Sequence, residues 1–240
     1  MICLYRTLDS TQDEIKRIRK AGMAYPDFGI VRALEQTKGR GRYDRQWLSE
    51  AEKNALFSFG YAHHTPLRDA YRLYQMAAVA LAEALQARKV NAVIKFPNDI
   101  LVKGKKIAGI LIENMVREGH IYYSIAGVGL NVNQEHFPRE LQAVSVLQLT
   151  GKYSLPEDWM EDIVSRFRLL RKATAEEIQQ KYLYYWQFKG TKKGILDTGG
   201  RPVPVKQWLW ETEALHVISH EDRHLHLPAR SLKLYGENEF

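Results

Sequence analysis

Three consecutive β-rich runs, separated by tight-turn signals, constrain the fold of this chain more than any other feature. The runs occupy residues 91–102, 106–116 and 121–133, and the turn signals between them are Lys103-Gly104 and Glu118-Gly119. Apolar and β-branched runs bounded by such turns are typical of strands. Because short turns join antiparallel neighbours, this part of the chain predicts a meander within one sheet.

The residues before these runs predict a strand–helix–strand–strand–helix order. Residues 2–8 alternate as a strand does, and residues 9–22 begin with an N-cap signal, continue as an amphipathic helix and stop at Gly22. Residues 28–36 and 55–62 predict two further strands. Between Pro66 and Lys89 the apolar residues recur at helical spacing, which predicts a long helix just before the meander.

The remaining chain changes character near residue 189. Residues 156–188 predict a long helix or a helix pair, and short strand-like segments with turns follow the sequence KGTKKG. The fold class is therefore α+β: a mixed, mostly antiparallel sheet with helices on one side, followed by a small β-barrel-like unit. We expect a catalytic domain at 1–188 and a small C-terminal β-domain at 189–240.

Charge and composition restrict the partners and the compartment. The 240 residues carry a formal net charge of +7, an excess that suits nucleotides, nucleic acid or an acidic protein partner. The single cysteine, Cys3, excludes a disulfide framework within the chain and favours a reducing compartment. The N-terminus lacks a signal-peptide pattern, and no apolar stretch is long enough to cross a bilayer, so we expect a cytoplasmic protein without a membrane partner.

Three separate polar stretches, each at the end of a predicted strand, carry the chemical signal. They are DSTQ at 9–12, QTKGRGRYDRQW at 36–47 and KFPNDILVKGKKIAGIL at 95–111. Their hydroxyls and amides suit a neutral polar ligand, and their arginines and lysines suit phosphate or carboxylate. The chain contains no P-loop, zinc-protease or nucleophile-elbow motif, and GRGRYD has Asp44 where a dinucleotide fingerprint needs its third glycine.

These stretches resemble the hallmark motifs of the biotin protein ligase family. The motif G-R-G-R-x-G-R-x-W is met by Gly39, Arg40, Gly41, Arg42, Arg45 and Trp47, with Asp44 in place of a glycine. The motif K-W-P-N-D-I, with a lysine seven residues after its aspartate, appears as KFPNDI with Lys106, and G-x-G-[IL]-N appears as GVGLN at 127–131. The resemblance is strong over about residues 5–133. It implies a class II synthetase-like, biotin/lipoate ligase catalytic domain and a small SH3-like C-terminal domain.

The resemblance implies a two-step ATP-dependent reaction. Biotin and ATP would form biotinyl-5′-adenylate and pyrophosphate, and the biotinyl group would pass to one lysine of a biotin carboxyl carrier protein, as in acetyl-CoA carboxylase. Mg²⁺ is expected with ATP. Because the chain begins at the catalytic strand, we expect a monofunctional form that lacks the N-terminal DNA-binding domain of some members and has no specific DNA target, acting as a monomer or homodimer.

The resemblance also assigns roles to residues. The expected catalytic residues are Lys106, Arg40 and Arg42. The expected biotin-binding residues are Ser10, Thr11, Gln12, Gln36, Gly39, Arg40, Gly41, Lys106 and Gly109. The expected ATP- or adenylate-binding residues are Arg42, Arg45, Trp47, Asn98 and Asn131. Asp99 is a possible helper in the transfer step, and the metal ligands are unknown.

The basic loop also predicts a change on ligand binding. We expect its cations to be unpaired and residues 37–53 to be mobile in the empty protein, because no apolar anchor precedes Trp47. Ligand would order the loop and exclude water from the adenylate, a mixed anhydride that hydrolyses readily.

Two classes of alternative remain open at this point. Lipoate ligases and octanoyl transferases are the nearest enzymatic rivals within the same superfamily. A nucleic-acid-binding protein could instead use the basic loop with Arg166, Arg168, Arg171 and Lys172. Of the four histidines at 216–226, His224 and His226 alternate with leucines, which favours an exposed strand face over a structural metal site.

Overall fold

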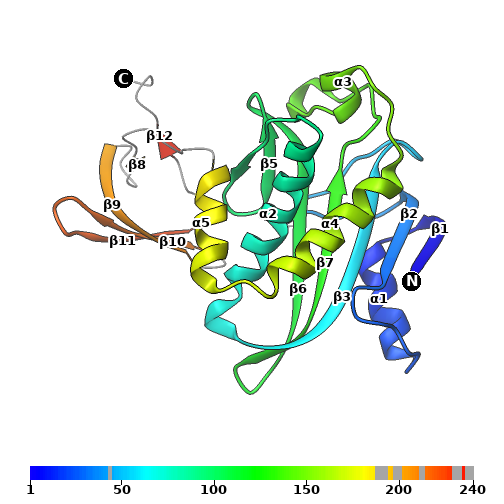
Figure 1. Cartoon of the computed structure of the whole chain (residues 1–240), viewed down its shortest axis with the longest axis horizontal. Coiled ribbons are helices and arrows are strands. Elements are labelled where there is room, and N and C mark those ends of the chain that lie inside the picture. The colour runs from blue at the N-terminus through cyan, green and yellow to red at the C-terminus, as the bar shows by residue number, and fades with distance from the viewer. Residues whose placement is uncertain (43–44, 187–193, 197–201, 211–213, 229–233, 236–240) are drawn as a thin grey trace.

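The computed structural model describes residues 1–42, 45–186, 194–196, 202–210, 214–228 and 234–235. Their strands form two sheets, one of seven strands and one of five (Figure 1). The predicted α+β class is confirmed.

The seven-stranded sheet has the order β1-β2-β3-β7-β6-β5-β4. Its strands are β1 Ile2–Leu8, β2 Ile30–Gln36, β3 Ala55–Pro66, β4 Val93–Lys95, β5 Asp99–Val102, β6 Lys105–Arg117 and β7 His120–Leu130. Only β1 and β2 run parallel; the other neighbours are antiparallel. The predicted meander is therefore confirmed. Its first run is divided into β4 and β5, which pair as an antiparallel hairpin with its turn at Pro97. Proline favours a turn over a continuous strand, because its φ is fixed and it has no N–H to donate.

Helices cover both faces of this sheet. The α-helices are α1 Thr11–Lys20, α2 Tyr71–Ala87, α3 Val146–Thr150, α4 Pro156–Leu170 and α5 Ala175–Tyr185, and two 3₁₀ turns are η1 Leu67–Asp69 and η2 Arg139–Leu141. Helices α2, α4 and α5 share one apolar core, in which nearly every residue from Leu73 to Leu85 is buried. The 156–188 segment is thus a helix pair. None of the described helices is both long enough and apolar enough to cross a membrane.

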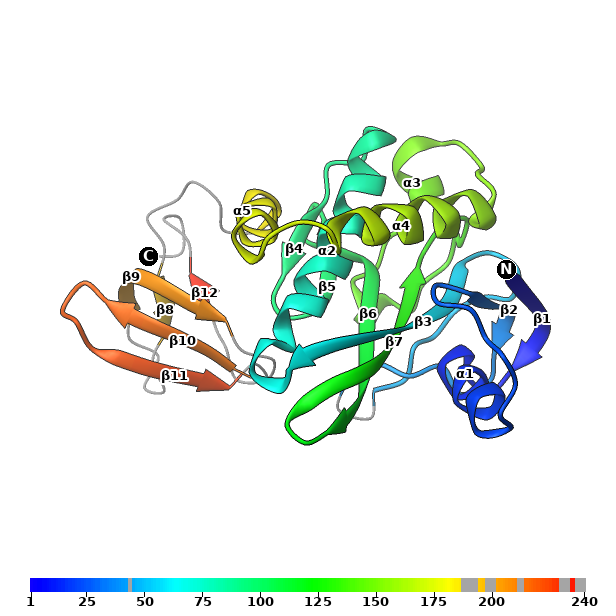
Figure 2. The same ribbon diagram turned by 60° about the horizontal axis from the view of Figure 1, so that its bottom comes forward.

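Helix α1 packs on the opposite face, so the expectation of helices on one side was wrong. Ile15 and Ile18 of α1 form a second apolar cluster with Val31 and Ile125, separate from the main core. Figure 2 shows α1 across the sheet from α2 and α4. The amphipathic pattern of residues 9–22 specifies which side of the helix is buried, and it contains no signal for the face of the sheet that the helix covers.

The C-terminal part contributes a five-stranded sheet with the order β11-β10-β9-β8-β12. Its strands are β8 Gly194–Leu196, β9 Pro202–Trp210, β10 Ala214–Ser219, β11 His224–Pro228 and β12 Leu234–Tyr235. This sheet fits the small SH3-like unit that the sequence predicted. Val217 of β10 is buried with the main core. The boundary at 188/189 lies outside the described residues and stays a prediction.

A partly buried histidine network lies where β3 meets β7. The Ser124 hydroxyl donates to Asn114, so it accepts from Nε2 of His63 at 2.8 Å. The Nδ1 atom of His63 then accepts from the Thr65 hydroxyl, also at 2.8 Å. Burial, with the nearby Arg171 cation, lowers the pKa of His63 to about 4, against a weaker raising effect of Asp27. The network therefore holds a neutral imidazole.

This network predicts a loss of stability in mild acid. Between pH 6.5 and pH 4 the unfolded chain binds a proton on His63 that the folded chain does not, so stability falls as the pH falls through this window. After allowance for partial solvent screening, we expect about 1 kcal/mol, or about 2–4 °C in melting temperature, between pH 7 and pH 5. The variant His63→Gln should show a flatter pH profile by calorimetry. An equal slope in both proteins would contradict the assignment.

Candidate active site

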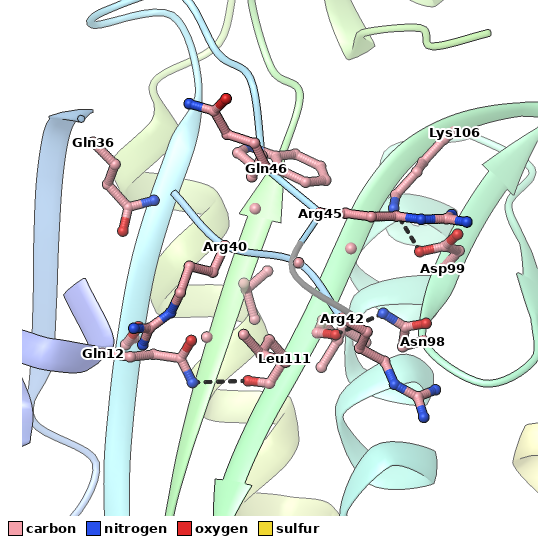
Figure 3. Close-up of a pocket in the computed structure, with 18 of the residues that line it drawn as sticks. Gln12, Gln36, Arg40, Arg42, Arg45, Gln46, Asn98, Asp99, Lys106 and Leu111 are labelled. Atoms are coloured by element: carbon pink, nitrogen blue, oxygen red, sulfur yellow. Dashed lines mark hydrogen bonds and ion pairs between the residues drawn. The ribbon is translucent and has the colours of Figure 1, made fainter. Parts of the chain in front are cut away.

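A cavity of about 560 Å³ opens where loop 37–47, the start of α1 and strands β2, β3, β5, β6 and β7 meet. Figure 3 shows Gln12, Gln36 and Arg40 on one side of this cavity and Asp99 and Lys106 on the other. The three polar stretches of the sequence therefore converge, although about 85 residues separate the first from the third.

Most of the predicted site residues line this cavity. They are Ser10, Thr11, Gln12, Gln36, Arg40, Gly41, Arg42, Arg45, Trp47, Asn98, Asp99, Lys106 and Gly109. Gly39 and Asn131 are not among the lining residues. Gly39 is part of loop 37–47, and its backbone oxygen accepts from the Trp47 backbone N–H at 2.9 Å.

The start of α1 forms one wall. Ser10 is the N-cap, and its hydroxyl accepts from the Asp13 N–H, while Thr11 in the first turn faces Gln36 and Ser58. The amide nitrogen of Gln12 donates to the Leu111 carbonyl at 3.2 Å. Thus the Ser10 oxygen caps the helix, as the N-cap signal predicted, while the Thr11 hydroxyl is bonded within the wall.

Arg40 is not unpaired, so that part of the loop prediction was wrong. Its two terminal nitrogens donate to both carboxylate oxygens of Asp13 at 2.8 and 2.9 Å, and Glu113 lies 3.5 Å away. Burial alone would raise the pKa of Asp13, but hydrogen bonds from Arg40 and Lys16 outweigh it and hold that pKa below its usual value. Asp13 and Glu113 lie outside the motifs, and no sequence signal linked them to the loop.

The loop is a small hairpin held by its own backbone. The Gly41 N–H donates to the Arg45 carbonyl at 2.6 Å, and Arg40 forms an isolated bridge with Gln46. The Arg42 guanidinium lies 5.9 Å from the Tyr74 ring. The departure at Asp44 lies outside the described residues. Whether ligand orders the loop stays a prediction.

Lys106 faces Asp99 across the β5–β6 hairpin. Its Nζ lies 2.6 Å from an Asp99 carboxylate oxygen and 5.3 Å from the centre of the Trp47 ring. Arg40 and Lys106, two of the three expected catalytic residues, are therefore each paired with a carboxylate, and of the two carboxylates Asp99 lines the cavity. An incoming anion has to compete with Asp13 for Arg40 and with Asp99 for Lys106.

Glycines make the floor on which Trp47 lies. A Cβ at Gly129 would lie 2.5 Å from the Trp47 ring, and one at Gly109 would lie 3.0 Å from it. Gly109 and Gly129 are directly paired on β6 and β7, and neither has a side chain, so the indole ring can pack against their backbone. The Trp47 Nε1 is buried and has no hydrogen-bond partner among the described residues, which marks an unfilled polar position.

The two asparagines of the motifs differ in position. Asn98 lines the cavity and is tied to β6 by a 2.9 Å hydrogen bond from its Nδ2 to the Ile110 carbonyl. Asn131 is buried behind the cavity, where its Nδ2 donates to the carbonyls of Val144 at 3.1 Å and Lys106 at 3.5 Å. Asn131 therefore braces the backbone that carries Lys106. A direct adenine contact by Asn131 stays a prediction.

Several lining residues were missed by the sequence analysis. They include Ser58, Lys95, Leu111, Gly127, Gly129 and Glu140. Lys95, Leu111, Gly127 and Gly129 belong to quoted motifs, so motif membership could have found them. Ser58 sits in a strand sequence, ALFSFGYA, whose pattern indicates only burial, and no local signal distinguishes it.

A family profile and individual relatives both match this chain, and they point to the same family. The profile described as "Biotin/lipoate A/B protein ligase family" matches residues 4–131. The Bifunctional ligase/repressor BirA of Bacillus spizizenii is 39% identical over 132 residues, which cover 53% of this chain and 41% of that protein. The Biotin--[acetyl-CoA-carboxylase] ligase of Mycobacterium tuberculosis is 32% identical over 136 residues, which cover 55% of this chain and 49% of that protein. The chain thus spans about half the length of these relatives.

Solved structures match nearly the whole chain. The biotin protein ligase of Aquifex aeolicus, in complex with biotin and ATP, has a TM-score of 0.73 at 23% identity and covers 98% of this chain and 99% of its own. The biotin protein ligase of Leishmania major, in complex with biotinyl-5-AMP, has a TM-score of 0.65 at 21% identity, with coverage of 95% and 98%. At these identities the similarity shows the fold.

Proposed function

The chain belongs to the biotin/lipoate A/B protein ligase family, and from this premise we propose that it is an ATP-dependent biotin protein ligase. It joins biotin to ATP to form biotinyl-5′-adenylate and pyrophosphate, and it then transfers the biotinyl group to a lysine of a biotin carboxyl carrier protein. The names of its relatives support biotin over lipoate or octanoate as the acyl substrate.

The observation that carries this proposal is the meeting of separate cations in one cavity. Arg40 and Arg42 come from the loop after β2, and Lys106 comes from β6, more than sixty positions later. In the first step, a biotin carboxylate oxygen bonds to the α-phosphorus while the bond to pyrophosphate breaks. Two anions must approach each other, so fixed positive charges beside both lower the barrier.

The wall of amides and hydroxyls suits the other end of biotin. Its ureido ring is neutral and polar, so burial requires matched donors and acceptors, which Thr11, Gln12 and Gln36 provide. Arg45 and Asn98 line the same cavity and are assigned to the nucleotide in this proposal.

In the second step, the neutral amine of the carrier lysine attacks the acyl carbonyl. The amide bond forms, the bond to AMP breaks, and one proton leaves the amine. Asp99 lines the cavity beside Lys106 and is the proposed helper for that proton.

Mg²⁺ is proposed to accompany ATP. Among the described residues, no group of three or more histidine, cysteine or acidic side chains is arranged to hold a metal. Magnesium bound through nucleotide phosphates needs only one or two carboxylates, and Asp99 and Glu140 are acidic residues that line the cavity. The site is therefore compatible with a metal that enters with its nucleotide.

The nucleic-acid alternative is less well supported. Arg166 is paired with Asp162, and the guanidinium groups of Arg168 and Arg171 lie within about 5 Å of the Phe28 ring. Arginines held by internal partners are less suited to neutralising a phosphate backbone. The proposed partners are therefore biotin, ATP and a carrier protein in the cytoplasm.

An exchange assay tests the proposal. The purified protein is incubated with ATP and labelled pyrophosphate, with biotin, lipoate or octanoate in parallel. We expect label to enter ATP only with biotin, and we expect biotin to appear on an added carrier domain. Exchange driven by lipoate or octanoate would reassign the acyl substrate, and no exchange with any acid would refute ligase activity.

A further inference from the structure

A buried serine outside the motifs completes one wall of the cavity. Ser58 lies on β3 and is 0% exposed. Its Oγ lies 2.7 Å from the hydroxyl oxygen of Thr11, on α1. The Thr11 hydroxyl lies 3.1 Å from Oε1 of Gln36, at the end of β2. Three elements are joined by this short chain of polar atoms.

The donor and the acceptor of each hydrogen bond between Ser58, Thr11 and Gln36 can be assigned. The backbone N–H of Thr11 can only donate, and it lies 2.8 Å from the same Gln36 atom, so that atom is the amide oxygen. Because an amide oxygen only accepts, the Thr11 hydroxyl donates its one proton to Gln36. The proton between Ser58 and Thr11 therefore belongs to Ser58.

These assignments leave one amide donor, on Gln36, and one amide acceptor, on Gln12, for a ligand in the cavity. With its oxygen held twice by Thr11, Gln36 has its Nε2 left for the cavity, as a donor of two N–H groups. Across the wall, the Gln12 amide is anchored by its nitrogen to the carbonyl of Leu111, which leaves its oxygen as an acceptor. A donor beside an acceptor matches a ligand that carries a carbonyl next to an N–H.

We propose that Ser58 is a positioning residue that sets the specificity of the cavity for a cyclic urea, by fixing the Thr11–Gln36 pair with the Gln36 N–H groups facing a ligand carbonyl. This inference rests on the proposed function and deepens it. Without the Ser58 proton, the Thr11 hydroxyl is free to turn away from Gln36, and one hydrogen bond of the wall is lost.

The test uses Ser58→Ala with biotin and with 2-iminobiotin, in which an imine replaces the urea carbonyl. We expect the KM for biotin to rise about five- to tenfold, as loss of one hydrogen bond predicts, with kcat and the KM for ATP unchanged. The preference for biotin over 2-iminobiotin should fall, because the fixed donor is placed to bond the urea carbonyl oxygen, which 2-iminobiotin lacks. Ser58→Cys, which keeps a weak donor of similar size, should lie between Ser58→Ala and the unmodified protein.

Ser124→Ala is the matched control. Ser124 is equally buried, and its hydroxyl serves Asn114 and His63 rather than the cavity. It should alter stability without changing the KM for biotin. Titration calorimetry with biotin alone measures the affinity for biotin directly and needs no turnover. An unchanged KM in a folded Ser58→Ala protein, or an equal rise in the KM for ATP, would overturn the role of Ser58. Absence of biotin binding to the unmodified protein would instead overturn the proposed function.

Discussion

Replacing Lys106 with alanine is expected to abolish biotinyl adenylate formation while leaving the fold intact. Lys106 is proposed to act through its charge and not through packing: its Nζ lies 2.6 Å from Asp99, and its side chain is one-third exposed. The variant removes a cation and leaves the Asp99 carboxylate facing two anionic substrates. Loss of one fixed electrostatic group lowers kcat by about 10²–10³-fold in comparable sites, and the remaining repulsion adds to that loss.

Lys105→Ala is the matched control for this experiment. Lys105 is the neighbouring lysine of the same hairpin, is exposed, and does not line the cavity. We expect both variants to melt within about 2 °C of the unmodified protein, because surface substitutions have small effects. Only Lys106→Ala should lose biotin-dependent pyrophosphate exchange. Normal exchange by Lys106→Ala would remove Lys106 from the mechanism.

Replacing Gly129 with alanine is expected to lower kcat/KM about 100-fold, although the change adds only one methyl group. That methyl would lie 2.5 Å from a carbon of the rigid Trp47 ring, so the ring has to move. The backbone N–H of Trp47 donates to the Gly39 carbonyl, so the movement passes to the loop that carries Arg40 and Arg42. A displacement of about 1 Å in a positioning element costs about this much activity.

A double variant shows whether the clash is the cause. Gly129→Ala should lower the melting temperature in the unmodified protein, because the methyl group and the indole compete for the same space. It should have little effect when Trp47 is already alanine, since the ring is then absent. Equal destabilisation in both backgrounds, measured by calorimetry, would show that Gly129 matters for another reason.

Local patterns predicted the secondary structure well, and non-local geometry was harder to predict. Turn signals such as Lys103-Gly104 indicated the meander, because a tight turn leaves its flanking strands few other arrangements. The parallel pairing of β1 with β2 and the position of α1 depend on contacts across the sheet. Periodicity identifies a buried side of an element, and it does not identify the partner.

For the site, too, the local motifs could be predicted from the sequence and the contacts between distant residues could not. Arg40, Lys106 and most of the other motif residues line one cavity, as their family resemblance implied. The pairing of Arg40 with Asp13 was missed, since the two lie 27 positions apart and Asp13 has no motif of its own. Ser58 was missed because a serine inside an apolar strand carries no local sign of its hydrogen bonds.

In the proposed mechanism, Arg40 and Lys106 leave their carboxylate partners to hold two ligands that repel each other. A crystal structure with biotin and a non-hydrolysable ATP analogue tests this most directly. We predict that the Arg40 guanidinium and the Lys106 ammonium both lie within about 2.7–3.2 Å of ligand carboxylate or phosphate oxygens. Ligands bound in the cavity with Arg40 still on Asp13 and Lys106 still on Asp99, neither touching a ligand, would contradict it.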